Sequence, residues 1–236
     1  MTPSTQARTI QIFLPNGEPR GLRIAELTTG IVQAVLIPRS ELAVAKKRSE
    51  LDHLAVYCLF GELENAAKPI VYIGQTEDAR KRLDFHNGTK DFWRNAVLGI
   101  SRTHSFTQAH LRYLEWYCIT KAKEVNRFEV ENDQIPSRPS VTEPMAADYL
   151  GAFQMLSLLI CTLGFPVFEP IHKGASFYCR GPDADACGEL VEEGFVIRAG
   201  SIARLVIAPA CVIPGTTGAI ASAAAAKKVS QISKRR

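Results

Sequence analysis

The stretch Pro69-Ile70-Val71-Tyr72-Ile73-Gly74 is apolar and rich in β-branched residues, and a second apolar run occupies residues 55–60. The polar stretch 62–68 separates the two runs. Short apolar runs that are bounded by polar or turn residues are typical of strands. The sequence therefore predicts two paired strands, one carrying Tyr57 and the other carrying Tyr72.

A helix is predicted directly after Gly74. Glu77 and Asp78 stand where the positive end of a helix dipole favours negative charge. We expect this helix to begin near Asp78 and to reach about His86.

A third strand and a second helix are predicted next. Residues 96–101 are mostly apolar and read as the strand. Ser105 and Gln108 have the spacing of an S-x-x-Q capping box, in which two side chains satisfy free backbone donors at a helix start. This helix is expected to reach about Lys123.

The chain divides into four predicted parts. Residues 1–50 contain short apolar runs between turn signals, which predicts an N-terminal β-rich module that ends in a short helix over 40–51. Residues 51–132 form the central domain. Residues 133–146 are rich in proline and predict a linker, and residues 147–236 form a C-terminal module.

The C-terminal module is expected to be α+β. An apolar helix is predicted over 147–163, followed by strands near 177–179 and 195–198 around a helix over 184–192. A basic tail follows from residue 215 onward.

The composition is that of a globular chain with little charge bias. Of 236 residues, 46% are hydrophobic and 22% are charged, and the net charge is +4. This charge is compatible with nucleic-acid binding but does not require it. Neither a membrane-spanning run nor a secretory signal is expected, so we predict a cytoplasmic protein without a membrane partner. Six cysteines without a C-x-x-C pair predict neither a zinc site nor a disulfide framework.

Glu115 stands out on the second predicted helix, because Leu111 and Ile119 lie one turn to either side of it. Its carboxylate is therefore expected on the apolar face of the helix. A buried carboxylate is costly unless a cation or hydrogen-bond donors compensate it. The pattern predicts a metal ion or an arginine opposite Glu115, or else a carboxylate that reaches water at the rim of the core.

Four more polar side chains are expected near this carboxylate. Arg82 and His86 are four residues apart and share one face of their helix, while Tyr57 and Tyr72 lie on the two strands. Two phenols, a guanidinium, an imidazole and a carboxylate suit phosphodiester hydrolysis. Each also has a structural explanation, since tyrosines are common in strands and an Arg/His pair is often a solvated helix face.

The order of these residues resembles the motifs of the GIY-YIG endonuclease family. Bacterial members with extra flanking domains, including a small uncharacterised C-terminal domain, are similar to this chain outside the central domain as well. The first motif reads AVY rather than GIY, which keeps the tyrosine and removes a glycine. The segments that carry the resemblance are Ala55-Val56-Tyr57, Val71-Tyr72-Ile73-Gly74-Gln75-Thr76, Arg82-Leu83 with His86, and Leu114-Glu115.

The resemblance implies a GIY-YIG domain over 51–132, an α/β (α+β) fold with a small mixed or antiparallel sheet flanked by helices. It also implies a role for each matched residue. The implied roles are Tyr57 as general base, Arg82 as transition-state stabiliser, Tyr72 and His86 in positioning or proton relay, Glu115 as the ligand of Mg²⁺ or Mn²⁺, and Gly74 and Asn132 in substrate binding, with Asn126 as the alternative to Asn132.

The implied activity is metal-dependent endonucleolytic hydrolysis of DNA. Tyr57 is expected to act as a phenolate, because Arg82 and a metal ion on Glu115 would lower its pKa. The segment after about Asn132 is expected to bind or position the substrate. Two alternatives remain: a non-catalytic nucleic-acid-binding protein with this fold, and an RNA-directed nuclease, since the motifs act on a phosphate and do not read the sugar.

Overall fold

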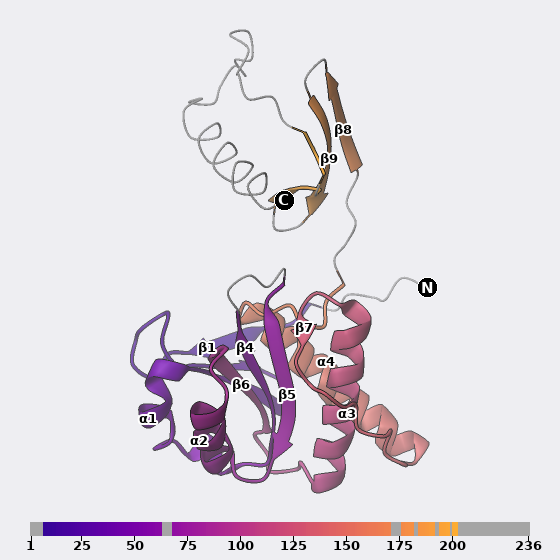
Figure 1. The fold of residues 1–236 in the computed structure, drawn as a ribbon. Helices are drawn as coiled ribbons and strands as arrows, with labels where there is room; N and C mark the ends of the chain where they lie inside the picture. The colour runs from indigo at the N-terminus through magenta and orange to yellow at the C-terminus, as the bar shows by residue number, and fades with distance from the viewer. Residues whose placement is uncertain are drawn as a thin grey trace. The chain divides into compact units, whose positions relative to one another are not determined.

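The computed structural model describes residues 7–62, 68–170, 176–181, 184–191, 194–198 and 200–202. The chain divides after Pro170 into two units, each with its own sheet (Figure 1). The described residues form a mixed α/β structure, which confirms the predicted fold class.

The first unit is built on a seven-stranded sheet with the order β1-β2-β3-β6-β4-β5-β7. Neighbouring strands are antiparallel, except that β5 and β7 are parallel. The strands are β1 Ile10–Phe13, β2 Arg23–Leu27, β3 Val32–Pro38, β4 Ala55–Gly61, β5 Ile70–Thr76, β6 Trp93–Ser101 and β7 Glu129–Val130.

Helices cover both faces of this sheet. One buried cluster joins α1 and α2 to one face, and another joins α3 and α4 to the opposite face (Figure 1). The central strands β3, β4 and β6 are therefore almost continuously buried instead of alternating between buried and exposed positions. The helices are α1 Leu42–Ala45, α2 Ala79–Thr89, α3 Gln108–Val125 and α4 Glu143–Thr162.

The central elements agree with the sequence prediction. Strands β4 and β5 pair antiparallel, and the third predicted strand is β6. Helix α2 starts after Asp78, whose side chain accepts a hydrogen bond from the backbone N–H of Lys81 at 3.0 Å. A cap of this kind satisfies one of the free donors of the first helical turn.

The predicted capping box of α3 is wrong by two residues. The N-cap is Thr107, whose side chain accepts from the backbone N–H of His110, while His110 Nδ1 accepts from the backbone N–H of Thr107 at 3.2 Å. Histidine thus takes the place that glutamate or glutamine usually has in this motif. Ser105 instead forms hydrogen bonds with Ser101 at the end of β6.

The N-terminal residues do not form a separate module. Strand β3 pairs along its whole length with β6, so β1, β2 and β3 extend the sheet of the central domain. The predicted helix over 40–51 is divided into a 3-10 turn (Arg39–Glu41), α1 and a second 3-10 turn (Ser49–Asp52). Arg80 of α2 donates to the carbonyl oxygens of Lys46 and Arg48, which fixes this segment against α2.

Helix α4 also belongs to the first unit, although the sequence assigns it to a C-terminal module. It begins at Glu143, packs against β2, β3 and α3, and buries Phe153, Leu156 and Ile160. Its contact with the sheet is close, because a Cβ added at Gly99 of β6 would lie 2.6 Å from Leu156 Cδ1. Residues 133–142 therefore connect two parts of one unit, and residues 143–146 of the predicted linker form the start of α4.

Helix α4 is long and apolar enough to cross a membrane by length and composition, in contrast to the expectation that no such run exists. Of its most apolar window, 39% is buried inside the structure. The apolar face packs on the sheet and α3, as the face of a core helix does.

The second unit is described by itself. Its three strands, β8 Ser176–Gly181, β9 Ala184–Val191 and β10 Gly194–Ile197, form an antiparallel sheet with the order β10-β9-β8. The two predicted strands are confirmed. The helix predicted over 184–192 is wrong, because Ala184–Val191 form β9, which pairs with strands on both sides. The predicted basic tail lies outside the described residues.

The division after Pro170 predicts which shortened chains fold. A chain of residues 1–170 should unfold cooperatively in urea, because it keeps the whole sheet and both helical layers. A chain of residues 1–142 lacks α4 and uncovers the sheet, so it should lose several kcal/mol, a large part of ordinary stability. Circular dichroism during urea titration would test this, and equal stability of the two chains would contradict the placement of α4.

Candidate active site

Tyr57 and Gly74 face each other across β4 and β5. The strand register pairs these two residues directly, and Tyr72 lies two positions before Gly74 on the same face of β5. A Cβ added at Gly74 would lie 2.4 Å from Tyr57 Oη, closer than any side chain tolerates. Glycine at this position therefore leaves the space that the phenol occupies.

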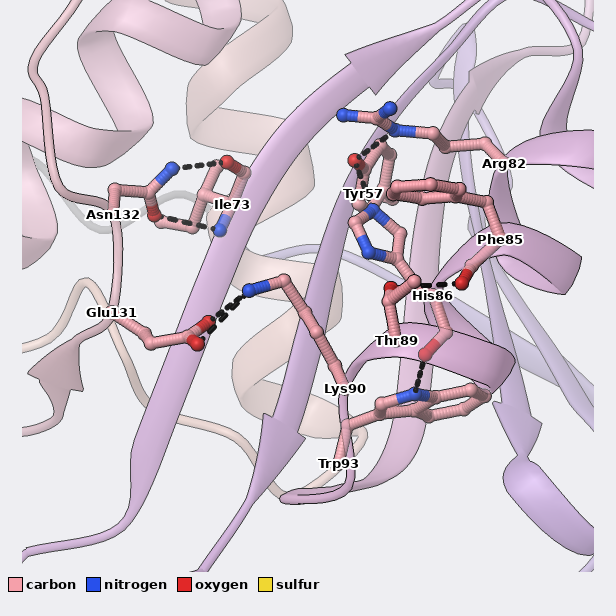
Figure 2. A network of polar contacts seen from close by, with 10 residues as sticks. All are labelled: Tyr57, Ile73, Arg82, Phe85, His86, Thr89, Lys90, Trp93, Glu131 and Asn132. Carbon is pink, nitrogen blue, oxygen red and sulfur yellow. Dashed lines mark hydrogen bonds and ion pairs between the residues drawn. The ribbon is translucent and has the colours of Figure 1, made fainter.

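Helix α2 brings a guanidinium and an imidazole to this phenol. Ala79 and Leu83 are buried against the sheet, which fixes the helix, and Arg82 and His86 lie one turn apart on the side toward Tyr57. Arg82 Nε donates a hydrogen bond to Tyr57 Oη at 2.8 Å, and Tyr57 Oη lies 2.8 Å from His86 Nε2 (Figure 2).

The direction of the bond between Tyr57 and His86 depends on the imidazole tautomer. A guanidinium only donates, so the phenol accepts from Arg82, and when the neutral imidazole carries its proton on Nδ1 the phenol donates to His86 Nε2. Burial lowers the pKa of His86 to about 4, and the positive charges of Arg82 and Lys90 contribute. The imidazole is therefore neutral at pH 7 and can accept the proton at Nε2. Its Nδ1 is buried and has no partner in the part of the chain that the structure describes.

The protein groups around Tyr57 do not by themselves favour the expected phenolate, for which the expectation also calls on a metal ion at Glu115. Burial raises the pKa of the phenol well above its ordinary value, since the side chain is 1% exposed. The hydrogen bond and charge of Arg82 act in the opposite direction but are outweighed. The sequence could place Arg82 near Tyr57 but could not show how deeply the phenol is buried.

Glu115 lies on α3 and is half-buried, as the apolar pattern around it predicts. Burial raises the pKa of its carboxyl group, while the backbone N–H of Gln75 and the charge of Arg82 lower it. Glu115 thus lies next to Gln75, near the end of β5. A half-buried carboxylate of this kind favours a cation that it can bind.

Asn132 forms hydrogen bonds with the backbone of β5. Its Oδ1 accepts from the backbone N–H of Ile73 at 3.0 Å, and its Nδ2 donates to the backbone oxygen of Ile73 at 2.7 Å (Figure 2). The amide is therefore occupied by β5 and positions the strand that carries Gly74. The alternative, Asn126, is the left-handed C-cap of α3, where Lys68 donates to its side chain and backbone.

Lys90 also lies at the site, a position that the sequence pattern does not predict. Its Nζ lies 4.4 Å from the centroid of the Tyr72 ring and 2.7 Å from Glu131 Oε2. The ammonium thus supports Tyr72 from one side and lowers the pKa of His86. Lys90 is the C-cap of α2 and has extended backbone, so helical spacing from His86 does not place its side chain.

Comparisons of this chain with protein-family models, with curated proteins and with solved structures find no match.

The contact between Gly74 and Tyr57 predicts opposite effects of one substitution at two glycines. Gly74→Ala should destabilise the protein by about 1–3 kcal/mol, the usual cost of overpacking a core, because the new methyl group meets the phenol. Gly88→Ala should stabilise it by about 0.5–1 kcal/mol, because Gly88 is helical and open space surrounds it. Urea denaturation of both variants would test this. Equal shifts in one direction would contradict the close contact.

Proposed function

We propose that this chain is a metal-dependent nuclease that hydrolyses the phosphodiester bonds of DNA, as its resemblance to the GIY-YIG family implies. The observation that carries the proposal is the buried chain from Arg82 through Tyr57 to His86, with 2.8 Å at both steps. A phenol that accepts from a cation and donates to a neutral imidazole is set up to pass a proton. A structural tyrosine needs only one such partner.

The geometry suits a base that never rests as a phenolate. When an attacking water gives its proton to Tyr57 Oη, the phenol passes its own proton to His86 Nε2. Tyr57 thus acts as the general base, and His86 takes the charge. Because Tyr57 is buried while Tyr72 and Arg82 are half-buried, water and substrate would approach on the side of Tyr72 and Arg82.

Arg82 is suited to hold the phosphate. Only one of its five N–H donors is used by Tyr57 in the described contact, and a guanidinium matches the geometry of phosphate oxygens. As the water oxygen bonds to phosphorus, one P–O ester bond breaks and negative charge gathers on the phosphate oxygens. A fixed cation stabilises that charge more than it stabilises the ground state.

Glu115 fits the single metal ligand that the family implies. It is a hard oxygen donor, and burial that raises its pKa favours a bound cation. The described residues contain no cluster of three or more metal-binding side chains. Mg²⁺ needs none, since it commonly binds through one or two carboxylates together with waters and substrate phosphate oxygens. When bound, it would supply Lewis-acid stabilisation of the phosphate oxygens.

The direct test is cleavage of labelled duplex DNA, single-stranded DNA and RNA in Mg²⁺ or in EDTA. Cleavage of DNA in Mg²⁺ alone would support the proposal. Preferred cleavage of RNA would show that RNA, and not DNA, is the substrate. Binding without cleavage of any substrate would favour the non-catalytic alternative.

Removing the proposed metal ligand should abolish chemistry and spare the fold. Glu115→Gln should reduce the single-turnover rate by roughly 10³-fold or more, because a metal ion contributes several kcal/mol to the transition state. The matched control is Glu124→Gln on the exposed part of the same helix, which should cleave normally. If Glu115→Gln cleaves at the control rate in Mg²⁺, Glu115 does not hold the metal.

The relay predicts an unusual pH dependence. His86 must be neutral to accept the proton, so this contribution is present above its pKa of about 4 and is lost as the pH falls through that value. The pKa of Glu115 is raised from its ordinary value, so its carboxylate is protonated and loses its ability to bind a metal ion at acid pH. The single-turnover rate should therefore be flat from pH 6 to 9 and fall only in acid.

Two variants distinguish proton transfer from Tyr57 to His86 from a mechanism in which Tyr57 is already ionised. In His86→Ala the phenol has no acceptor and must ionise by itself, so the rate should rise with pH over the same range. Tyr57→Phe should lose roughly 10²- to 10⁴-fold in rate at every pH, the usual share of a general base. A wild-type rate that rises tenfold per pH unit would show that Tyr57 ionises before it acts.

A further inference from the structure

Phe85 is the exposed aromatic side chain of α2. Its side chain is 57% exposed, whereas Phe60, Phe92 and Phe106 of the same unit are buried. Its neighbours on the solvent side of α2 are polar, among them Lys81 and Asp84. Isolated exposed apolar residues are common, so the place of Phe85 beside the site is what matters.

Phe85 lies next to the hydrogen-bond chain of the site. The guanidinium carbon of Arg82 is 5.6 Å from the centroid of the Phe85 ring, and the ring meets that of His86 edge to face, also at 5.6 Å. Figure 2 shows the ring beside Arg82, Tyr57 and His86. The same helix therefore presents a cation and an exposed aromatic ring side by side.

We propose that Phe85 is a stacking platform for one unstacked nucleobase of the substrate, held while Arg82 binds the adjacent phosphate. This inference rests on the proposed nuclease function. Proteins that bind single strands combine cations for the backbone with aromatic rings for the bases, and the stacking tolerates any base because every base has an aromatic face. Arg82 and Phe85 supply one of each.

The proposal also names the substrate class. In a continuous duplex each base face is covered by its neighbours, so a ring beside the phosphate-binding group meets a free face only where a base is unstacked. The enzyme therefore acts on single-stranded or locally unpaired DNA.

The test measures binding separately from cleavage. The full chain carrying Glu115→Gln is titrated, without divalent metal, with a fluorescently labelled oligodeoxythymidine and with an abasic oligonucleotide of the same length. Adding Phe85→Ala should weaken binding to the first by roughly tenfold, within the range for loss of one base–aromatic stack. Binding to the abasic strand, which has charge but no bases, should not change.

The matched control is Phe13→Ala on β1, where the phenylalanine is 59% exposed and remote in the strand order from β5. It should leave both affinities unchanged. Phe85→Trp should restore binding, whereas Phe85→Leu should not, because leucine keeps apolar bulk without an aromatic face. Urea denaturation of each variant checks that the fold is kept.

The outcomes separate this inference from the proposed function. An equal loss for the intact and abasic strands, no loss in Phe85→Ala, or no binding of the oligodeoxythymidine would overturn the platform. A Phe85→Ala loss on continuous duplex as large as on single strands would overturn the substrate class. Cleavage by the wild-type chain is scored independently, so a nuclease without the Phe85 effect would falsify this inference alone, and stacking without any cleavage would leave only a binding protein.

Discussion

The close approach of Tyr57 to Gly74 is the constraint on which the rest of the site depends. The β4–β5 register places the two residues opposite each other, and the missing side chain at Gly74 leaves room for the phenol. Because the phenol is fixed there, Arg82 and His86 can both reach its oxygen from one helix. A larger residue at position 74 would displace Tyr57, and with it the contacts that Arg82 and His86 make to the phenol oxygen.

Most of the site could be predicted, because its residues lie on short elements whose geometry is regular. Helical spacing places Arg82 and His86 on one face. The shared face of Tyr57 and Tyr72 depends on the register that pairs Tyr57 with Gly74 and Leu59 with Tyr72. What the sequence could not provide is the environment. The pKa of Tyr57 depends on how completely its neighbours exclude water, and the role of Asn132 depends on contact with Ile73, 59 residues away in the sequence.

The fold was predictable element by element but not in its connections. Turn residues and apolar runs locate β4, β5, β6 and the helices after them. The pairing of β3 with β6 joins residues far apart in the sequence, and an apolar helix such as α4 carries no signal of which sheet it covers. The apolar residues of β9 follow neither the helical nor the strand repeat strongly, so the sequence pattern predicts a helix there. The pairing of β9 with β8 and β10 makes it a strand.

The side chain of Asn132 closes part of the exposed edge of β5. Strand β7 pairs with β5 over only two residues, and the Asn132 amide then supplies the donor and acceptor that a further strand residue would offer to Ile73. An exposed strand edge is a template for adding another chain and leads to aggregation. Asn132 thus occupies the backbone donor and acceptor of Ile73 that would otherwise be open to another strand, on the same strand that carries Gly74.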